Sequence, residues 1–177
     1  MVDAQLWLSK GVSTDDAEST TVDVDDLDVT LLALFAGWAA ADQVRQRLEA
    51  RGFAGVRFAD GLIFQHLVGT DRTIGELAAR MEVTQQAASK AVAGLRDRGW
   101  VELAVDPGDA RARRVALSDR GRAAVDAGRQ VRAEVVAELA GSCGAEDMAA
   151  ARRVLLAMID AQGVDVSIRR RKILPPR

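Results

Sequence analysis

Three polar side chains between residues 86 and 90 have the types and the spacing of a surface that hydrogen-bonds to a partner. Ser89 lies three residues after Gln86 and Lys90 lies four residues after it, so a helix over this segment places all three on one face. In the major groove of duplex DNA, glutamine can pair with adenine, lysine with guanine and serine with either base. An exposed helix face is polar in most proteins, so an ordinary solvated surface explains this short pattern equally well.

The helix that must hold these side chains is bounded by two residues with strong end preferences. Thr84 is a good N-cap residue, and Gly99 tolerates the left-handed backbone that commonly follows a helix. We expect Thr84 and Gln85, at the start of this helix, to contact the DNA backbone or flanking bases. The opposite face is apolar and is expected to pack inward: Ala88, Ala91, Val92 and Leu95.

A shorter helix is predicted just before this one. Thr73 and Glu76 have the spacing of a capping box, in which the hydroxyl and the carboxylate satisfy backbone amides at the helix start. An apolar stripe follows at helical intervals: Ile74, Leu77, Ala78 and Met81. Glu82 and Val83 then turn the chain toward Thr84. A short packed helix, a turn and a second helix with a polar outer face make a helix-turn-helix.

A β-hairpin is predicted after the second helix. Its first strand shows the alternation of a half-buried strand, with apolar residues at every second position: Val101, Leu103 and Val105. A return strand is expected over residues 113–117, and Pro107 suits the second position of a tight turn that begins at Asp106. This arrangement places Arg111 near the tip of the hairpin.

The arginines of this hairpin favour contacts with DNA. A guanidinium on a narrow ribbon suits the narrow, negatively charged minor groove of A·T-rich DNA, which predicts a minor-groove role for Arg111. Asp109, two residues earlier, can position that side chain by paired hydrogen bonds. Arg113 and Arg114 are expected to contact phosphates. The alternative is an ordinary solvated surface loop.

Residues 73–121, TIGELAARMEVTQQAASKAVAGLRDRGWVELAVDPGDARARRVALSDRG, resemble the DNA-binding region of the MarR family of bacterial and archaeal regulators. The helix pair corresponds to IGELAARM and QQAASKAVAGLRDRG, and the hairpin, called the wing in this family, to DPGDARARRV. The resemblance implies an obligate homodimer whose two recognition helices enter successive major grooves. It also implies repression of a nearby promoter until a small molecule or an oxidant releases the protein.

The helices expected on either side of this region suit a dimer. The first begins among residues 25–28 and ends near Gly52, and its middle is apolar nearly all round, so it must be buried on more than one side. Ser118 is expected to cap a long helix that runs to about Ala140, and another helix follows over residues 145–161. By the resemblance, helices from both ends interlock with those of a second subunit. An intramolecular bundle in a monomer is the alternative.

The predicted fold is mainly α with a small β-hairpin wing: a winged helix-turn-helix flanked by N- and C-terminal dimerisation helices. The predicted division of the chain has an acidic, partly disordered N-terminal extension (1–24), an N-terminal dimerisation helix (25–52), a winged helix-turn-helix DNA-binding region (57–117), C-terminal dimerisation helices (118–163) and a basic tail (164–177).

Charge is separated along the chain, although the formal net charge is only −2. The first 28 residues hold eight acidic residues against Lys10 alone, whereas basic residues gather in the hairpin and at the C-terminus. Local basic surface is what phosphate contact requires. With no basic-then-apolar leader and no apolar stretch near 20 residues long, we expect a cytoplasmic protein without a membrane segment.

Catalytic and metal-binding patterns are missing from the sequence. His66 is the single histidine and Cys143 the single cysteine, so there is no zinc-type ligand spacing, and neither a Gly-rich phosphate loop nor a GxSxG turn occurs. We therefore expect no enzyme activity, no metal and no cofactor. His66 is interpreted as structural, and Cys143 as either an incidental thiol or an oxidant sensor.

A crevice between the dimer helices and the DNA-binding region is where the resemblance places a small-molecule inducer. The residues that could line it are four aromatic residues and the single histidine, although the sequence favours plain core for each: Phe35, Trp38, Phe58, Phe64 and His66. The chemistry of the inducer and the sequence of the operator stay open.

These features together predict a sequence-specific, DNA-binding transcriptional regulator, a ligand-responsive repressor that binds a pseudo-palindromic operator on double-stranded DNA as a homodimer. The alternative is a winged-helix protein-interaction module that does not read DNA sequence. A steep salt dependence of DNA binding together with sequence preference separates the two.

Overall fold

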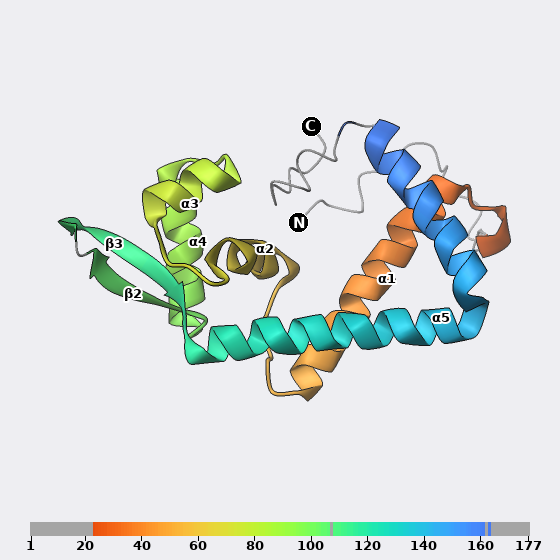
Figure 1. The fold of residues 1–177 in the computed structure, drawn as a ribbon, viewed down its shortest axis with the longest axis horizontal. Helices are drawn as coiled ribbons and strands as arrows, with labels where there is room; N and C mark the ends of the chain where they lie inside the picture. Colours follow the sequence, from red (N-terminus) through yellow and green to blue (C-terminus); the bar gives the residue numbers. More distant parts are fainter. Residues whose placement is uncertain (1–22, 107, 162, 164–177) are drawn as a thin grey trace, which may run out of the picture.

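The computed structural model describes residues 23–106, 108–161 and 163, and at positions 109–111 it describes the backbone only. The basic tail and most of the acidic N-terminal extension lie outside these residues. The described chain is mainly helical, with a small antiparallel sheet at one end (Figure 1). None of its helices is both long enough and apolar enough to cross a membrane.

The first long helix, α1 (Val29–Ala50), follows a 3₁₀ turn, η2 (Val24–Asp26). Asp28 is its N-cap, and the carboxylate accepts the backbone N–H groups of Thr30 at 2.7 Å and Leu31 at 3.2 Å. Past its end, Gly52 has φ 87°, a left-handed conformation that reverses the chain. This helix thus begins and ends where the carboxylates and the glycine predict.

The helix-turn-helix comprises α3 (Ile74–Met81) and α4 (Gln85–Asp97), preceded by α2 (Phe58–Leu67) and the short strand β1 (Arg72–Thr73). The predicted capping box is formed: the Thr73 hydroxyl accepts the N–H of Glu76 at 3.1 Å, and the Glu76 carboxylate accepts the N–H of Thr73 at 2.7 Å. Thr84 caps α4, and Gly99, with φ 75°, follows its end.

The hairpin, which we call the wing, consists of β2 (Val101–Asp106) and β3 (Asp109–Leu117). The strand order is β1-β3-β2, all antiparallel, with Val101 opposite Leu117 and Val105 opposite Arg113. Asp106 then pairs with Asp109, so residues 110–112 form a bulge without partners on β2.

This register gives the position of Arg111 within the wing. The chain reverses between Asp106 and Asp109, where the Asp106 carboxylate accepts the N–H of Gly108 at 2.7 Å. The return strand therefore begins four residues earlier than the predicted Arg113, and Arg111 lies in the bulge of β3 rather than at the turn. Alternation of apolar residues could not reveal this, because the bulged residues do not follow a period of two.

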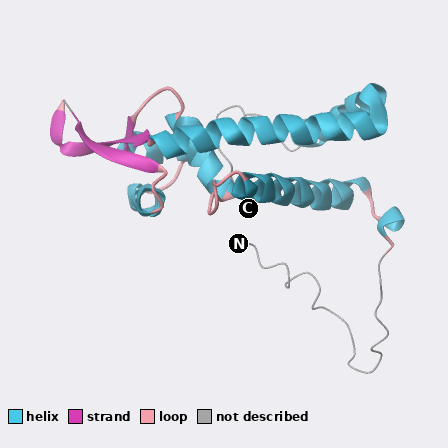
Figure 2. Cartoon of the chain, turned by 90° about the horizontal axis from the view of Figure 1, so that it is seen from below, coloured by secondary structure: helices cyan, strands magenta, loops and turns pink. Residues whose placement is uncertain are grey.

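The last helix, α5 (Asp119–Ala161), consists of two helical segments that meet at Gly144, whose φ of 85° and ψ of 166° are not helical. The sequence predicted this break between Ala140 and Ala145. Figure 2 shows the strands gathered at one end of the molecule and the long first segment of α5 running from them toward the other end. The start of α5 is fixed by Ser118, which accepts the N–H of Gly121 and donates to the Gly99 carbonyl.

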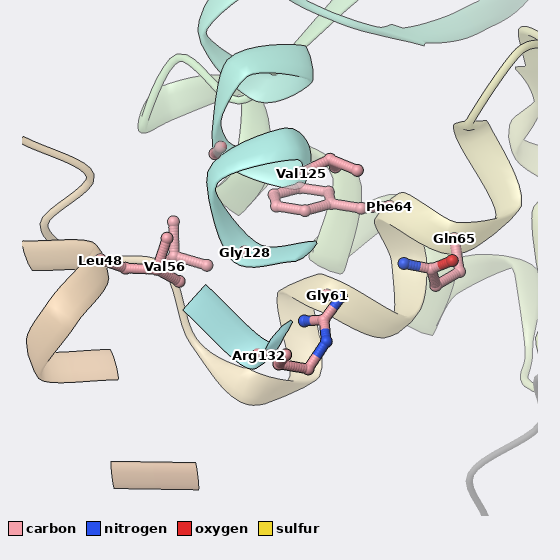
Figure 3. Close-up of a pocket in the computed structure, with 9 residues that line it drawn as sticks. Leu48, Val56, Gly61, Phe64, Gln65, Val125, Gly128 and Arg132 are labelled. Carbon is pink, nitrogen blue, oxygen red and sulfur yellow. The ribbon is translucent and has the colours of Figure 1, made fainter. Parts of the chain in front are cut away.

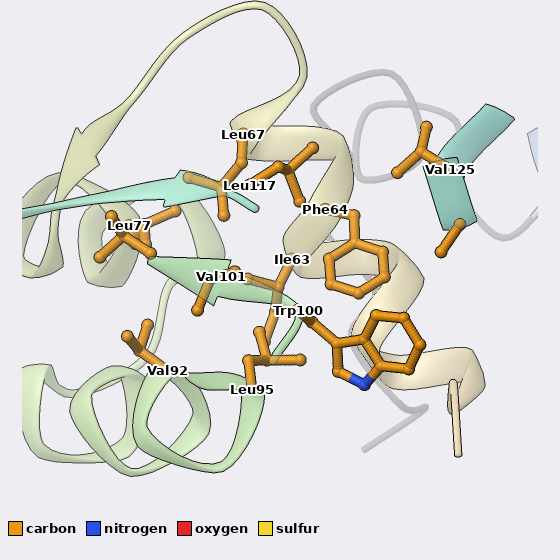
Figure 4. Packing of buried hydrophobic residues seen from close by; sticks show 12 residues of the cluster. Ile63, Phe64, Leu67, Leu77, Val92, Leu95, Trp100, Val101, Leu117 and Val125 are labelled. Atoms are coloured by element: carbon orange, nitrogen blue, oxygen red, sulfur yellow. The ribbon is translucent and has the colours of Figure 1, made fainter. Parts of the chain in front are cut away.

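The core of the winged helix lies where α2, α3, α4, the sheet and the start of α5 meet (Figure 4). Trp100, only 1% exposed, is among its largest residues and packs against Phe64, with ring centroids 6.4 Å apart. The start of α5 passes so close to Trp100 that a Cβ atom at Gly121 would overlap the Trp100 carbonyl. A second cluster, formed by Leu48 with Ala127, Val131 and Val135, packs α1 against α5.

Candidate nucleic-acid interface

The outer face of α4 is an open polar surface of the helix-turn-helix. Gln86, Ser89 and Lys90 are all exposed, and so are Thr84 and Gln85 at the helix start. The inner face is buried, with Ala88, Val92 and Leu95 in the core. The structure thus brings the predicted base-reading residues together on one face, free to meet a partner, and their pairing with bases stays a prediction.

An ion pair fixes the far end of α4 to α2. Arg98, directly after α4, donates from Nη1 and Nη2 to the two oxygens of Asp60 at 2.5 and 2.9 Å. The same guanidinium donates from Nε to the Gly94 carbonyl and from Nη1 to that of Gly55. Asp60 also accepts the N–H of Arg57 at 2.8 Å, so both sides of the pair are anchored.

Sequence analysis missed this pair. The two residues are 38 positions apart, and nothing in the local pattern of either one points to the other. The side chain of Asp60 is only 8% exposed, and its contact with the guanidinium of Arg98 raises the pKa of that arginine above its ordinary value. The one available sign was an acidic residue set in an apolar helix, because a buried carboxylate needs a partner.

The two neighbouring arginines of β3 differ in their surroundings. Arg113 is exposed, and its contact with a phosphate stays a prediction. Arg114 points to the other face of the strand and is held by Asp71 and Asp106, with Nε–Oδ2 at 2.8 Å and Nη1–Oδ2 at 2.9 Å respectively. These carboxylates raise the pKa of Arg114, and its guanidinium lowers the pKa of Asp71.

The assignment of Arg114 as a phosphate contact therefore needs correction. Its positive charge is already matched by two carboxylates of its own chain, and a phosphate would have to displace them. The side chains of Arg111 and Asp109 lie outside the described part of the wing. The minor-groove contact of Arg111 and its positioning by Asp109 stay predictions.

The five residues predicted to line an inducer crevice differ in their surroundings in the single chain. Phe35 and Trp38 stack edge to face on α1, 5.5 Å apart, and Trp38 is 55% exposed. Phe58, at the start of α2, is 72% exposed, whereas Phe64 and His66 are buried. Phe58 and Phe64 thus lie on opposite sides of α2, one in solvent and one in the core.

A small hollow does lie between the end of α1, α2 and α5 (Figure 3). Its volume is about 50 Å³, whereas pockets for drug-sized ligands have about 300–1,000 Å³. Of the predicted crevice residues only Phe64 reaches it, and the other lining residues were not predicted: Leu48, Val56, Gly61, Gln65, Ala124, Val125, Gly128 and Arg132. In the single chain this hollow is too small to hold an inducer of that size.

Two further residues singled out in the sequence are His66 and Cys143. The backbone carbonyl of His66 accepts the Nε–H of Arg72 at 2.7 Å, which ties α2 to β1. Cys143 is exposed on α5, with its thiol 2.9 Å from the Leu139 carbonyl. Among residues 23–106, 108–161 and 163 no group of histidine, cysteine and carboxylate side chains could hold a metal ion.

Known proteins share features with this chain. Residues 54–112, which run from before α2 into the wing, match the model described as the MarR family. A comparison with curated proteins finds no match.

Solved structures share the fold over most of the chain. YusO of Bacillus subtilis is 20% identical with a TM-score of 0.61, and the match covers 79% of this chain and 99% of that one. A cysteine-to-serine mutant of MarR from E. coli is 19% identical with a TM-score of 0.54, covering 75% and 97%. A mutant of MepR from S. aureus bound to an oligodeoxyribonucleotide is 17% identical with a TM-score of 0.55, covering 77% and 99%. Residues 54–112 are thus similar to the MarR family, and the winged-helix fold built around them is shared with these solved structures.

Proposed function

We propose that this protein is a sequence-specific DNA-binding transcriptional regulator. The observation that carries the proposal is the outer face of α4, where Gln86, Ser89 and Lys90 stand exposed on a helix whose opposite face is packed into the core. These side chains have the donors and acceptors that base edges in the major groove require. The fold-sharing MepR structure, which is bound to an oligodeoxyribonucleotide, supports this assignment.

The wing supplies the second set of contacts. Arg113 is exposed on β3 and is assigned to a phosphate, Thr84 and Gln85 to the backbone or flanking bases, and Arg111 to the minor groove. The overall charge of −2 does not oppose DNA binding, because the affinity depends on the cations that face the phosphates and on the counterions they release.

A homodimer is part of the proposal. Exposed apolar side chains follow α1 at helical spacing, and more of them lie on the second segment of α5: Leu31, Leu32, Leu34, Phe35 and Trp38, and Val154, Leu155 and Leu156. Single exposed apolar residues are ordinary, but a run of this size on two helices marks an interaction surface. A second copy of the chain that covers these helices would present two α4 faces.

Such a dimer would bind a pseudo-palindromic operator. Two-fold symmetry of the protein requires two half-sites with centres about 10 bp apart, one turn of the double helix. We further propose that the protein acts as a repressor and that an inducer releases it from DNA. Because the hollow of one chain is small, the inducer site is assigned to a space completed by the second subunit.

Selection of bound duplexes from a random DNA pool, at about physiological salt, tests the function. Enrichment of an inverted repeat by the wild-type protein, weakened by Arg111→Ala, is the expected result. Glu102→Gln serves as the matched control, because Glu102 is an exposed residue of the same hairpin. A folded dimer that enriches no sequence would count against DNA reading and would favour a winged-helix module that binds proteins.

A further inference from the structure

Arg114 links all three strands of the small sheet. It lies on the central strand β3, opposite Thr73 of β1 and Ala104 of β2. Its guanidinium donates from Nε and Nη2 to the two carboxylate oxygens of Asp71, at 2.8 and 3.0 Å. Nη2 also donates to the Asp71 carbonyl, and Nη1 donates to Asp106 at 2.9 Å. We call these three residues the wing clamp.

The two carboxylates of the wing clamp belong to segments with different roles. Asp71 directly precedes β1, where Thr73 is the N-cap of α3. Asp106 ends β2, and its second oxygen accepts the N–H of Gly108 in the turn of the wing. The clamp is therefore a continuous path of hydrogen bonds from the start of the helix-turn-helix to the turn of the wing.

The part of the wing that lacks regular pairing lies directly before the clamp. Residues 110–112 have no register partners on β2, so the strand ladder does not determine their direction. Arg111 is the middle residue of this bulge. The fixed points on either side of it are Asp106 with its turn and Arg114 with its two carboxylates, and both belong to the clamp.

We propose that Arg114 is a positioning residue for DNA recognition: the wing clamp holds the wing at one angle to α4, and this angle gives the wing its preference for a narrow A·T minor groove. Arg114 itself does not contact DNA. The inference rests on the proposed function and names a residue that determines its specificity. The Asp71 carboxylate contributes in the same way, although it would repel phosphate if it acted alone.

The test compares two duplexes that share the selected major-groove site and differ only in the minor-groove segment that faces the wing, which is A·T in one and G·C in the other. For each protein the dissociation constants give an A·T preference ratio, and their dependence on salt gives a slope. Arg114→Ala and Asp71→Asn are the test variants, Arg113→Ala is the phosphate-contact control, and Glu102→Gln controls for the loss of one negative charge.

The proposal predicts that Arg114→Ala and Asp71→Asn each lower the A·T preference ratio by about fivefold or more, the discrimination that one contacted base pair supplies. The salt slope should stay at the wild-type value. Arg113→Ala should instead reduce the slope by about 0.9 and leave the ratio intact. In an Arg111→Ala background, Arg114→Ala should have no further effect on the ratio, because Arg114 acts through the wing.

Several results would overturn the proposal. If Arg114→Ala reduces the salt slope by about 0.9 and keeps the ratio, Arg114 is a direct phosphate contact. If Asp71→Asn tightens binding to both duplexes equally, the carboxylate merely repels DNA. Should Arg114→Ala fail to fold, an unchanged ratio for Asp71→Asn decides against the clamp. If the wild-type protein itself selects no sequence, the proposed function fails first and this inference falls with it.

Discussion

Asp60 and Arg98 form a two-pronged ion pair that joins the first turn of α2 to the end of α4, the helix whose outer face carries the proposed base-reading residues. Because Asp60 is buried, removal of the arginine leaves its negative charge in the protein interior without an opposite charge. The orientation of α4 thus depends on a contact within the protein itself.

We expect Arg98→Met to lower the free energy of unfolding by about 3 kcal/mol, because the buried carboxylate of Asp60 loses its ion-pair partner. Urea denaturation followed by circular dichroism measures this change. The matched control is Arg96→Met on the same helix, whose partner Asp97 is exposed. That exposed pair should contribute less than about 1 kcal/mol. Equal effects of the two variants would show that the buried pair contributes no more to the free energy of unfolding than the exposed pair.

Gln86→Ala should weaken binding to the selected operator by about 1–3 kcal/mol and relax the preference for one base pair, because glutamine can hold adenine through two hydrogen bonds. Binding to a panel of operators with single base changes measures both effects. Binding to random DNA should be nearly unaffected. An equal loss on specific and random duplexes would contradict a base-reading role.

Gly121→Ala should destabilise the protein by about 1–3 kcal/mol, because the new methyl group overlaps a backbone carbonyl that cannot move without shifting Trp100. The control is Gly141→Ala, also on α5, where a Cβ atom meets nothing within 4 Å. That change should be neutral or stabilise the helix by up to about 1 kcal/mol. Thermal unfolding of the two variants should therefore shift in opposite directions or differ clearly in size.

Glu76→Gln should make stability less dependent on pH in the acidic range. The bond from the Thr73 backbone N–H, followed by that from its hydroxyl, lowers the pKa of Glu76 below its ordinary value. A lowered pKa in the folded state stabilises the protein above the unfolded pKa and loses this effect as the pH falls through the folded pKa. The variant should thus be less stable near pH 7, and the difference should close between about pH 5 and pH 3. A difference that stays constant over this range would contradict the assignment.

Trp38→Arg should yield a folded monomer, or a dimer that dissociates at a much higher protein concentration than the wild-type dimer. The reason is that a charge would replace an exposed apolar side chain of the proposed interface. Sedimentation velocity over a range of concentrations measures this. The control is Val83→Arg, which changes an exposed apolar residue outside α1 and α5. If the wild-type protein is itself monomeric, or the two variants dimerise alike, the dimer surface is assigned wrongly.

Local features were predictable from the sequence because their causes lie within a few residues. The Thr73–Glu76 capping box, the exposed face of α4 and the break near Gly144 each follow from side-chain chemistry, helical periodicity or backbone freedom over one or two turns. The order of the helices and of the hairpin strands β2 and β3 was predictable for the same reason, whereas the two-residue strand β1 was not predicted. These interactions exist in the chain before distant segments meet.

The tertiary structure decided which side chains work together. Arg113 and Arg114 are neighbours of one type, yet one is exposed and the other is clamped by Asp71, 43 positions away. Arg98 forms an ion pair with Asp60, which lies 38 positions away in the sequence. Phe58 and Phe64 lie on the same helix, yet one is exposed and the other is buried. A charge or an aromatic ring carries no record in its local sequence of which distant segment folds against it. The sequence alone determined the helices, the hairpin and the face that α4 presents. The ion pairs that orient these elements form only when the packed core brings distant segments together.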